Sequence, residues 1–313
     1  MPRKVIIDCD PGIDDAVALC MALFDPRLEV LAVTATAGNV TGDQATRNVQ
    51  ALIEQLDPPR YPRMGAASPA ESLAMVDNRP LYGEDGLGNI GLASSKLARQ
   101  HPAEKLICDE VRAAPGEVTL VCLGPLTNIA AAINREPQLI SMLGRLVIMG
   151  GSVNGIGNVT SAAEFNIYFD PHSARQVFRS PTTKTLIPLD VTTQVTWSLD
   201  LLDQLPPETT RAGKLLRSTL PHLFRTYRRD LGLEGIHLHD AVAMAAVLHP
   251  ELFTTREFSG DVETAGELTL GATVFDRRST AHNRGDMEVA LEIDSAAVND
   301  CVVRALLDAG RQT

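Results

Sequence analysis

Four aspartates lie within eight positions near the start of the chain, directly after an apolar run: Asp8, Asp10, Asp14 and Asp15, in the stretch VIIDCDPGIDDAVAL. Carboxylates that converge with nothing between them repel one another, so these side chains either fan out into water or surround a cation. Asp14 and Asp15 also suit the first turn of a helix, where the helix dipole favours negative charge. The stretch therefore indicates either a helix start or a metal site.

Strands and helices alternate along the first half of the chain. KVIID precedes DDAVALCMALF, LEVLAVTAT precedes DQATRNVQALIEQL, and EVTLVCLG precedes PLTNIAAAIN. This alternation predicts an open, mostly parallel, Rossmann-like α/β sheet with helices on both faces. The strands are almost continuous runs of Val, Ile and Leu, which is typical of strands that are buried on both sides.

The second half of the chain predicts a small antiparallel extension to this sheet. After a long helical stretch, EFSGDVETAGELTLGATVFDRR and MEVALEID have the pattern of antiparallel strands, and SAAVNDCVVRALLDAG predicts a last helix. Residues 65–90 are interpreted as a long loop, which is uncommon unless it is functional. Because the chain contains no Gly/Ser-rich linker and no internal repeat, we expect a single domain over residues 1–313.

Polar residues follow several predicted strands, at the edge where open α/β sheets bind their ligands. They are rich in carboxylates and amides and poor in Lys and Arg: Asn39 after the second strand, Asn158, Glu164 and Asn166 after RLVIM, and His239 and Asp240 at a later helix start. Oxygen ligands without a Cys/His cluster favour a hard cation such as Ca²⁺. A second acidic position at Asp240 therefore favours the metal site over the plain helix start.

Each of these features also has an alternative explanation. Asn39 suits a turn, the Asn of GPLTN suits a helix cap, and His239 suits a helix start. DCD after a strand also occurs in phosphatases of the haloacid dehalogenase type, but Pro11 and Gly12 follow it and no Lys is obvious among the polar residues. A non-catalytic sensor of nucleosides or ribose would keep the same site without turnover.

The ordered set of motifs resembles one family. DCDPGIDDAVAL at residues 8–19, TAGN at 36–39, GPLTNIA at 124–130, MGG at 149–151, GNVTSAAEFNIYFDP at 157–171 and HDAVA at 239–243 are similar, in this order, to the motifs of the nucleoside hydrolases, which are calcium-dependent nucleoside N-ribohydrolases. The resemblance extends over essentially the whole chain. It implies the nucleoside hydrolase fold and cleavage of the N-glycosidic bond of ribonucleosides to ribose and free base.

The resemblance also implies a role for each matching residue. Ca²⁺ would be held by Asp10, Asp15, Asp240 and the main-chain carbonyl of Leu123. The ribose hydroxyls and the 5′ group would be bound by Asp14, Asn39, Asn158, Glu164, Asn166 and Asp240. Asp10 would also accept a proton from a metal-bound water, and His239 would protonate the leaving base. Asp8 would orient other groups from outside the site.

One position departs from the family pattern. Where many relatives have the pattern HG..GL, this chain has YGEDGLG, so Tyr82 replaces a histidine that is implicated in holding or protonating the leaving base. A phenol is a poorer acid near neutral pH, yet it can donate a hydrogen bond or stack on a base. Tyr227 is a candidate to close over the base, with a packed core aromatic as the alternative. The base preference of relatives therefore does not transfer to this chain.

Composition and charge narrow the classes of function. A hydrophobic content of 44%, a net charge of −11 and an isoelectric point near 5.1 describe a globular protein without the basic face that nucleic-acid binding needs. We expect no membrane span and no secretory signal. Five cysteines in apolar runs, without metal-type spacing, predict buried thiols in a cytoplasmic protein. The expected partner is a small ribonucleoside, and the resemblance implies a homodimer or homotetramer.

Overall fold

The main sheet has nine strands among the residues that the computed structural model describes, which are 1–69, 76–95, 100–278 and 287–313. Their bounds are β1 (Arg3–Cys9), β2 (Leu28–Ala35), β3 (Arg63–Ala66), β4 (His101–Pro102), β5 (Val118–Cys122), β6 (Arg145–Met149), β7 (Lys184–Ile187), β8 (Phe253–Phe258) and β11 (Met287–Ile293). They lie in the order β4-β3-β2-β1-β5-β6-β7-β11-β8. All neighbouring strands are parallel except β8, which runs antiparallel to β11.

The predicted mostly parallel sheet and its small antiparallel extension are therefore confirmed. The small antiparallel sheet consists of β9 (Gly260–Val262) and β10 (Thr273–Phe275). The stretch MEVALEID forms β11, which runs antiparallel to β8 as expected and also joins the main sheet parallel to β7. A short apolar pattern predicts a strand but does not select the neighbour with which the strand pairs.

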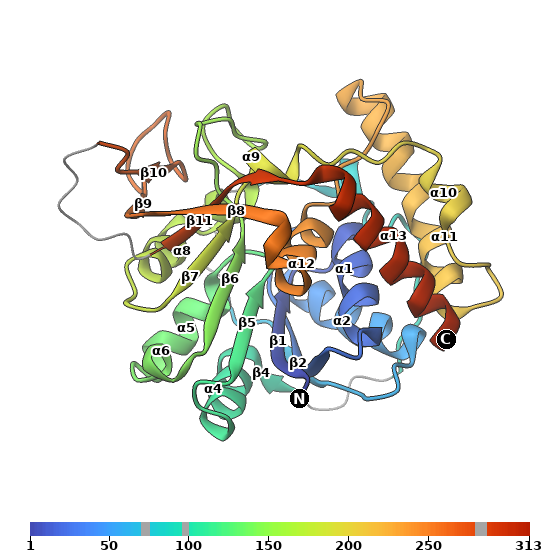
Figure 1. The fold of residues 1–313 in the computed structure, drawn as a ribbon, viewed down its shortest axis with the longest axis horizontal. Coiled ribbons are helices and arrows are strands. Elements are labelled where there is room, and N and C mark those ends of the chain that lie inside the picture. Colours follow the sequence, from blue (N-terminus) through green and yellow to red (C-terminus); the bar gives the residue numbers. More distant parts are fainter. Residues whose placement is uncertain (70–75, 96–99, 279–286) are drawn as a thin grey trace.

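Helices cover both faces of the main sheet (Figure 1). One face carries α1 (Ile13–Phe24), α2 (Gly42–Leu56), α11 (Arg211–Thr226), α12 (His239–Leu248) and α13 (Ser295–Gln312), and the other carries α4 (Ala103–Ala113), α5 (Thr127–Arg135) and α8 (Pro171–Phe178). The shorter helices are α3 (Arg79–Tyr82), α6 (Leu139–Met142), α7 (Phe165–Phe169), α9 (Leu189–Thr192), α10 (Leu201–Gln204), the π-helix η1 (Tyr227–Leu231) and the 3₁₀-helix η2 (Pro250–Leu252). No helix within the described ranges combines the length and the apolarity that crossing a membrane requires.

Two smaller predictions meet different outcomes. Residues 65–90, expected to form a loop, contain the end of β3 and the single turn of α3, while residues 70–75 lie outside the described part of the chain. The five cysteines are all buried and free, as expected.

The strand β1, beside the middle strand of the sheet, determines where a ligand can bind. It lies between β2 and β5, and Val5, Ile6 and Ile7 in it are fully buried. From β1 the chain builds β2, β3 and β4 outward on one side, and later β5, β6 and β7 on the other. The direction of winding therefore reverses between β1 and β5, and the carboxyl ends of these two strands border the crevice where such sheets bind ligands.

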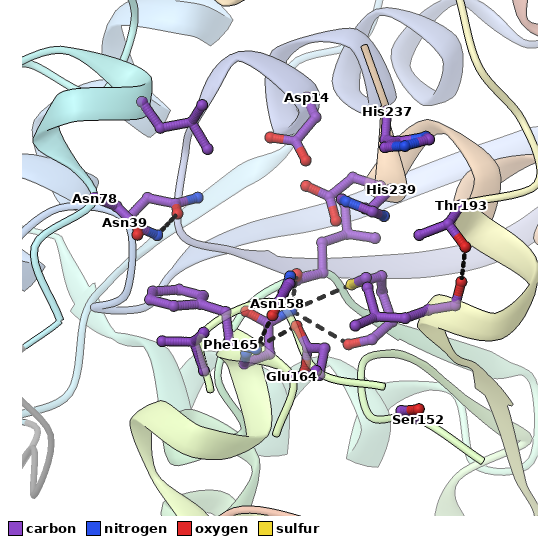
Figure 2. Close-up of a pocket in the computed structure, with 18 of the residues that line it drawn as sticks. Asp14, Asn39, Asn78, Ser152, Asn158, Glu164, Phe165, Thr193, His237 and His239 are labelled. Atoms are coloured by element: carbon purple, nitrogen blue, oxygen red, sulfur yellow. Dashed lines mark hydrogen bonds between the residues drawn. The ribbon is translucent and has the colours of Figure 1, made fainter. Parts of the chain in front are cut away.

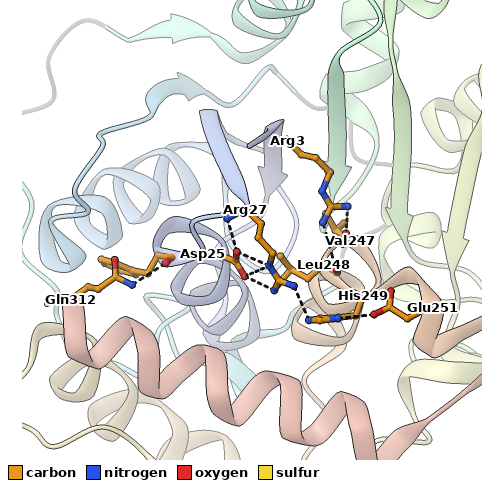
Figure 3. A network of polar contacts seen from close by, with 9 residues as sticks. Arg3, Asp25, Arg27, Val247, Leu248, His249, Glu251 and Gln312 are labelled. Carbon is orange, nitrogen blue, oxygen red and sulfur yellow. Dashed lines mark hydrogen bonds and ion pairs between the residues drawn. The ribbon is translucent and has the colours of Figure 1, made fainter. Parts of the chain in front are cut away.

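The helices α1 and α12 begin at this crevice and pack against each other. A polar network holds their opposite ends together (Figure 3). Arg3 donates a hydrogen bond to the carbonyl of Val247, near the end of α12, at 2.6 Å. Arg27, shortly after α1, donates to the carboxylate of Asp25 and to Nε2 of His249, which lies 3.0 Å away. The network therefore fixes the end of α1 against the end of α12.

The only tryptophan in the chain anchors the segment that leads into α12. Trp197 and Ile236 form an isolated antiparallel bridge, in which the N–H of each bonds to the carbonyl of the other, at 3.0 and 2.9 Å. The side chain of Trp197 is buried, and its indole N–H has no hydrogen-bond partner among the residues that the structure describes. The bridge fixes the chain shortly before His239.

We expect Arg27→Ala to lower the free energy of unfolding by about 1 kcal/mol, because its hydrogen bonds to Asp25 and His249 are lost. Urea denaturation followed by circular dichroism measures this change. The matched control is Arg60→Ala, which removes an exposed ion pair with Glu29 and should leave the midpoint unchanged. Equal midpoints for the two variants would contradict the importance of the network.

Candidate active site

Three buried carboxylates converge where α1 and α12 begin. Asp14 and Asp15 lie in the first turn of α1, and Asp240 lies in the first turn of α12. One carboxylate oxygen from each residue lies within 4.8 Å of those from the other two. The partial positive charge at each helix N-terminus favours carboxylates there. Oδ1 of Asp14 and Oδ1 of Asp15 are buried and have no hydrogen-bond partner in the described part of the chain, so the cluster offers oxygen atoms to a ligand.

These carboxylates resist ionising together. Burial, followed by the charge of neighbouring carboxylates, raises the pKa of Asp15 to about 8 and the pKa of Asp240 well above its usual value. Burial raises the pKa of Asp14 to about 6, and burial together with the charge of Asp15 raises the pKa of Asp10. Buried like charges disfavour one another's ionised form. A cation between them would remove that penalty, because its own charge reverses the local effect on the pKa.

Asp10 lies beside this cluster, in a slot between two glycines. Its Oδ2 accepts a hydrogen bond from the main-chain N–H of Asn39 at 2.7 Å. A Cβ atom on Gly38 would lie 2.1 Å from Oδ2 of Asp10, and a Cβ atom on Gly124 would lie 2.4 Å from Oδ1. Both distances are far shorter than any non-bonded contact allows. The chain after β2 and the chain after β5 can therefore close on Asp10 only with glycine at these two positions.

A pocket of about 490 Å³, a size typical of small-molecule sites, opens over these carboxylates. Figure 2 shows Asp14, His237 and His239 near one another, Asn39 with Asn78 on another side, and Glu164 below. The predicted site residues that line the pocket are Asp10, Asp14, Asn39, Tyr82, Leu123, Asn158, Glu164, Asn166, Tyr227, His239 and Asp240. The remaining predicted residue, Asp15, belongs to the carboxylate cluster without lining the pocket.

Main-chain hydrogen bonds fix the polar groups on one wall of the pocket. Glu164 accepts hydrogen bonds from three main-chain N–H groups at 2.9, 3.0 and 3.2 Å, and burial raises its pKa to about 7 in spite of them. Asn166 donates from Nδ2 to the carbonyl of Leu123 at 2.7 Å. Asn158 accepts from the N–H of Phe165 at 2.9 Å, so its side-chain amino group is free to donate. This wall presents oxygen acceptors and amide donors in fixed orientations.

Another wall carries aromatic and imidazole rings. His237 lies between Tyr227 and His239, with ring centroids 6.2 and 5.7 Å away. Nδ1 of His239 contacts Oγ1 of Thr192 at 2.8 Å. Burial, and then the neighbouring His237, lowers the pKa of His239 to about 3, while burial raises the pKa of Tyr82 well above its usual value. Near neutral pH His239 and Tyr82 are therefore uncharged hydrogen-bonding groups on this wall, beside the ring faces.

The sequence profile of one family matches almost the whole chain. The family is described as inosine-uridine preferring nucleoside hydrolase, and the match covers residues 5–300. The chain belongs to this family. It is 39% identical to the pyrimidine-specific ribonucleoside hydrolase RihA of Klebsiella pneumoniae, over 98% of this chain and 99% of that protein. It is also 39% identical to the non-specific ribonucleoside hydrolase RihC of Escherichia coli, with the same coverage.

Solved structures of nucleoside hydrolases share the fold. A plant nucleoside hydrolase superimposes with a TM-score of 0.91 at 32% identity, covering 98% of this chain and 99% of the other. A purine-preferring ribonucleoside hydrolase from Gardnerella vaginalis superimposes with a TM-score of 0.92 at 30% identity, covering 99% and 100%. The predicted family, fold and class of enzyme, a nucleoside N-ribohydrolase, are thereby confirmed.

The donor set of this nucleoside hydrolase fits a hard divalent cation, because it consists of oxygen atoms. The sequence-based prediction placed Asp10, Asp15 and Asp240 around the metal. Within the described residues, the group whose carboxylate oxygens lie within 4.8 Å of one another contains Asp14, together with Asp15 and Asp240, and does not include Asp10. The carbonyl of Leu123, the fourth predicted ligand, already accepts one hydrogen bond, and a carbonyl oxygen has a second lone pair for a cation.

Asp8 has a structural position outside the pocket. Its Oδ1 accepts hydrogen bonds from Oγ1 of Thr34 and from Nδ2 of Asn128. Asn128 also donates to the carbonyl of Ala35 at 2.7 Å and accepts from the N–H of Ser68 at 3.1 Å. The Asn of GPLTN, for which a helix cap was the alternative, therefore joins the ends of β1 and β2 to the chain after β3.

Sequence reasoning did not single out several residues of the site. Gly38 and Gly124 lie inside the quoted motifs, and a glycine two or three positions after a buried strand is a usable signal of close backbone approach. His237 lies two positions before His239, with no pattern to distinguish it from a core residue. Asn78 lies in the stretch interpreted as a loop, where no pattern indicates which residues face the pocket.

We expect Gly124→Ala to weaken the binding of a divalent cation roughly 10- to 100-fold, the usual effect of displacing a group that supports a metal site. The added methyl group would collide with the Asp10 carboxylate. Calorimetric titration of metal-free protein with Ca²⁺ measures the affinity. The control is Gly42→Ala, whose Cβ would approach nothing closer than a methyl carbon at 3.0 Å. Wild-type affinity in a folded Gly124→Ala protein would exclude the proposed slot.

Proposed function

We propose that this nucleoside hydrolase cleaves the N-glycosidic bond of ribonucleosides to ribose and free base, with Ca²⁺ bound by Asp10, Asp15, Asp240 and the carbonyl of Leu123. The observation that carries the proposal is the group of buried, partly unpartnered carboxylates at the floor of a pocket of nucleoside size. The relatives named as ribonucleoside hydrolases support the same reaction.

The ribose would bind at the polar wall. The groups proposed for its hydroxyls and the 5′ group are Asp14, Asn39, Asn158, Glu164, Asn166 and Asp240, all of which line the pocket. Glu164 is fixed by three main-chain hydrogen bonds and keeps lone pairs that can accept from a hydroxyl. Fixing the sugar in one orientation lowers the entropic part of the barrier.

Bond cleavage builds positive charge on the ribose, so the reaction needs a water attacking one face and help for the departing base on the other. Asp10 is the proposed general base for that water, because the N–H of Asn39 and the slot between Gly38 and Gly124 hold its carboxylate in place. A bound Ca²⁺ would lower the pKa of a coordinated water and orient it. The ionised Asp10 that this role requires is consistent with a cation beside it.

The base would leave against the aromatic wall. His239 is proposed to donate to the departing base, and Tyr82 and Tyr227 to bind its ring or its edge. Because burial lowers the pKa of His239, its neutral imidazole is best suited to donate a hydrogen bond as the bond to ribose breaks. The relatives are described as pyrimidine-specific, non-specific and purine-preferring, so the preference of this chain depends on its own wall residues.

The phosphatase alternative finds no support in the pocket. Among the described residues that line it there is no Lys or Arg to bind a phosphate. A sensor of nucleosides without turnover would have the same pocket, so an activity measurement has to separate it from the enzyme. The predicted homodimer or homotetramer and the cytoplasmic location stay predictions.

The decisive experiment measures the reducing sugar released from a panel of purine and pyrimidine ribonucleosides. We expect release that a chelator abolishes and Ca²⁺ restores, together with about one calcium per chain by elemental analysis. Asp10→Asn should lower turnover by ~10²–10⁴-fold, the usual effect of losing a general base. Binding of nucleosides without any release would identify a sensor, and full activity after chelation would refute the metal site.

His239→Ala provides a test of leaving-group help. We expect a loss of roughly 10²-fold or more on inosine or uridine, in the range for removing a group that assists proton transfer. p-Nitrophenyl riboside should stay within a few-fold of wild type, because its leaving group is already a stable anion. Steady-state rates on both substrates measure the difference. Equal losses on both would show that His239 only supports the structure of the site.

A further inference from the structure

Asn78 has an unusual arrangement directly before the turn that carries Tyr82. It occupies the N-cap position of α3, where an asparagine side chain commonly accepts a hydrogen bond from the N–H groups of the first turn. Its side chain makes no such cap. Instead, Nδ2 of Asn78 donates to Oδ1 of Asn39 at 2.9 Å, across the edge of the pocket (Figure 2). The side chain is therefore committed to the site and not to its own helix.

Asn39 is already held in one orientation without this bond. Its main-chain N–H donates to Oδ2 of Asp10 at 2.7 Å, and its Nδ2 donates to the main-chain carbonyl of Asp10 at 3.3 Å. These two contacts turn Oδ1 of Asn39 away from Asp10 and toward Asn78. Oδ1 of Asn39 is thus an acceptor whose position is already fixed. The hydrogen bond to it therefore fixes the side chain of Asn78.

The turn that follows Asn78 is otherwise held mostly through its main chain. A helix of four residues is too short to be stable by itself. The carbonyl of Asn78 accepts from the N–H of Tyr82 at 3.0 Å, and the carbonyl of Tyr82 accepts from the N–H of Gly88 at 2.7 Å. Oγ1 of Thr226 donates to the carbonyl of Leu81 at 3.2 Å. Among these contacts, only the bond from Asn78 to Asn39 joins the start of the turn to the ribose side of the site. Removing the bond from Asn78 to Asn39 would leave the start of the turn without its side-chain attachment to the site.

Asn39 and Tyr82 also meet at one glycine. A Cβ atom on Gly12 would lie 2.9 Å from Nδ2 of Asn39 and 3.3 Å from Cδ1 of Tyr82. The two side chains therefore lie on the same small surface, one on the ribose side and the other on the base side. The contacts close a ring that runs from Asn39 through Asn78 to Tyr82 and returns over Gly12.

We propose that Asn78 is a positioning residue that holds Tyr82 against the leaving base, with Asn39 as its anchor. The inference rests on the proposed function, because it needs a substrate whose base departs at this wall. It assigns Asn78 to the base side of the site, although the residue it contacts lies on the ribose side. Loss of the bond moves Tyr82, while Asn39 keeps both of its contacts with Asp10.

The test compares Asn78→Ala and Asn78→Asp with wild type on inosine, uridine and p-nitrophenyl riboside. Asn78→Asp keeps the size of the side chain but replaces the Nδ2 donor by an acceptor. Both variants should lose roughly 3- to 10-fold in kcat on the natural nucleosides, the range that one neutral hydrogen bond supplies. Both KM and kcat for the activated riboside should stay within about 2-fold of wild type, since that base departs without help.

The control in the same segment is Asp77→Ala, which removes the ion pair with Arg79 and the hydrogen bond that Asp77 accepts from the N–H of Arg79, but leaves the bond between Asn78 and Asn39 in place. It should keep wild-type rates on all three substrates. In a Tyr82→Ala background, Asn78→Ala should have no further effect, because residues that act through one another are not additive. Thermal unfolding of each variant shows whether the comparison is made on folded protein.

Three outcomes would overturn the inference. Equal losses on natural and activated substrates would place Asn78 with the ribose. The same losses of kcat in Asp77→Ala would show that any disturbance of this segment lowers the rate, without a specific role for Asn78. Full additivity with Tyr82→Ala would show that Asn78 does not act through Tyr82. A wild-type protein that releases no sugar from any nucleoside would instead refute the proposed function, so the two failures are distinguishable.

Discussion

Mutual repulsion among buried carboxylates is the constraint on which the rest of this structure depends. Two unit charges 4 Å apart repel by about 4 kcal/mol at the effective dielectric constant of a protein site, ~20. Asp10, Asp14, Asp15 and Asp240 are nevertheless brought together from two ends of the chain. The N-termini of α1 and α12 offset part of this cost, and the proposed cation would offset more. The arrangement is stable only if the backbone around the four residues is held firmly by other contacts.

The fold supplies that support from both directions. At the crevice, the ends of β1, β2 and β5 close on Asp10, and Asn128 joins the strand ends through Asp8. At the far side, Arg27 and its neighbours fix the other ends of α1 and α12. Both helices are therefore held at both ends, and their carboxylates project from the held N-termini. Such preorganisation is what a site needs if its groups are to hold their geometry before a ligand arrives.

Much of the fold and of the site could be predicted from the sequence, because the position of each motif relative to its strand indicates where the motif lies in the fold. A polar side chain in the segment that follows a buried parallel strand lies near the sheet edge where ligands bind, and this rule led to Asp10, Asn39 and Glu164, which line the pocket. The pairing of β11 with β7 could not be predicted, since a strand pattern does not name its partner. The contact of Asn78 with Asn39 depends on how a turn without hydrophobic periodicity packs against the site. Tertiary packing determines such contacts, and the local sequence pattern does not predict this packing.

The bridge between Trp197 and Ile236 gives the protein an optical property. Trp197 is the only indole in the chain, it is buried, and its bridge partner lies just before His237 and His239. The emission wavelength of an indole increases when water reaches the ring. Fluorescence from this one residue therefore reports on the segment that carries the histidines, without interference from any other tryptophan. The chain contains its own spectroscopic probe beside the wall of the pocket, so changes there can be followed without attaching a label.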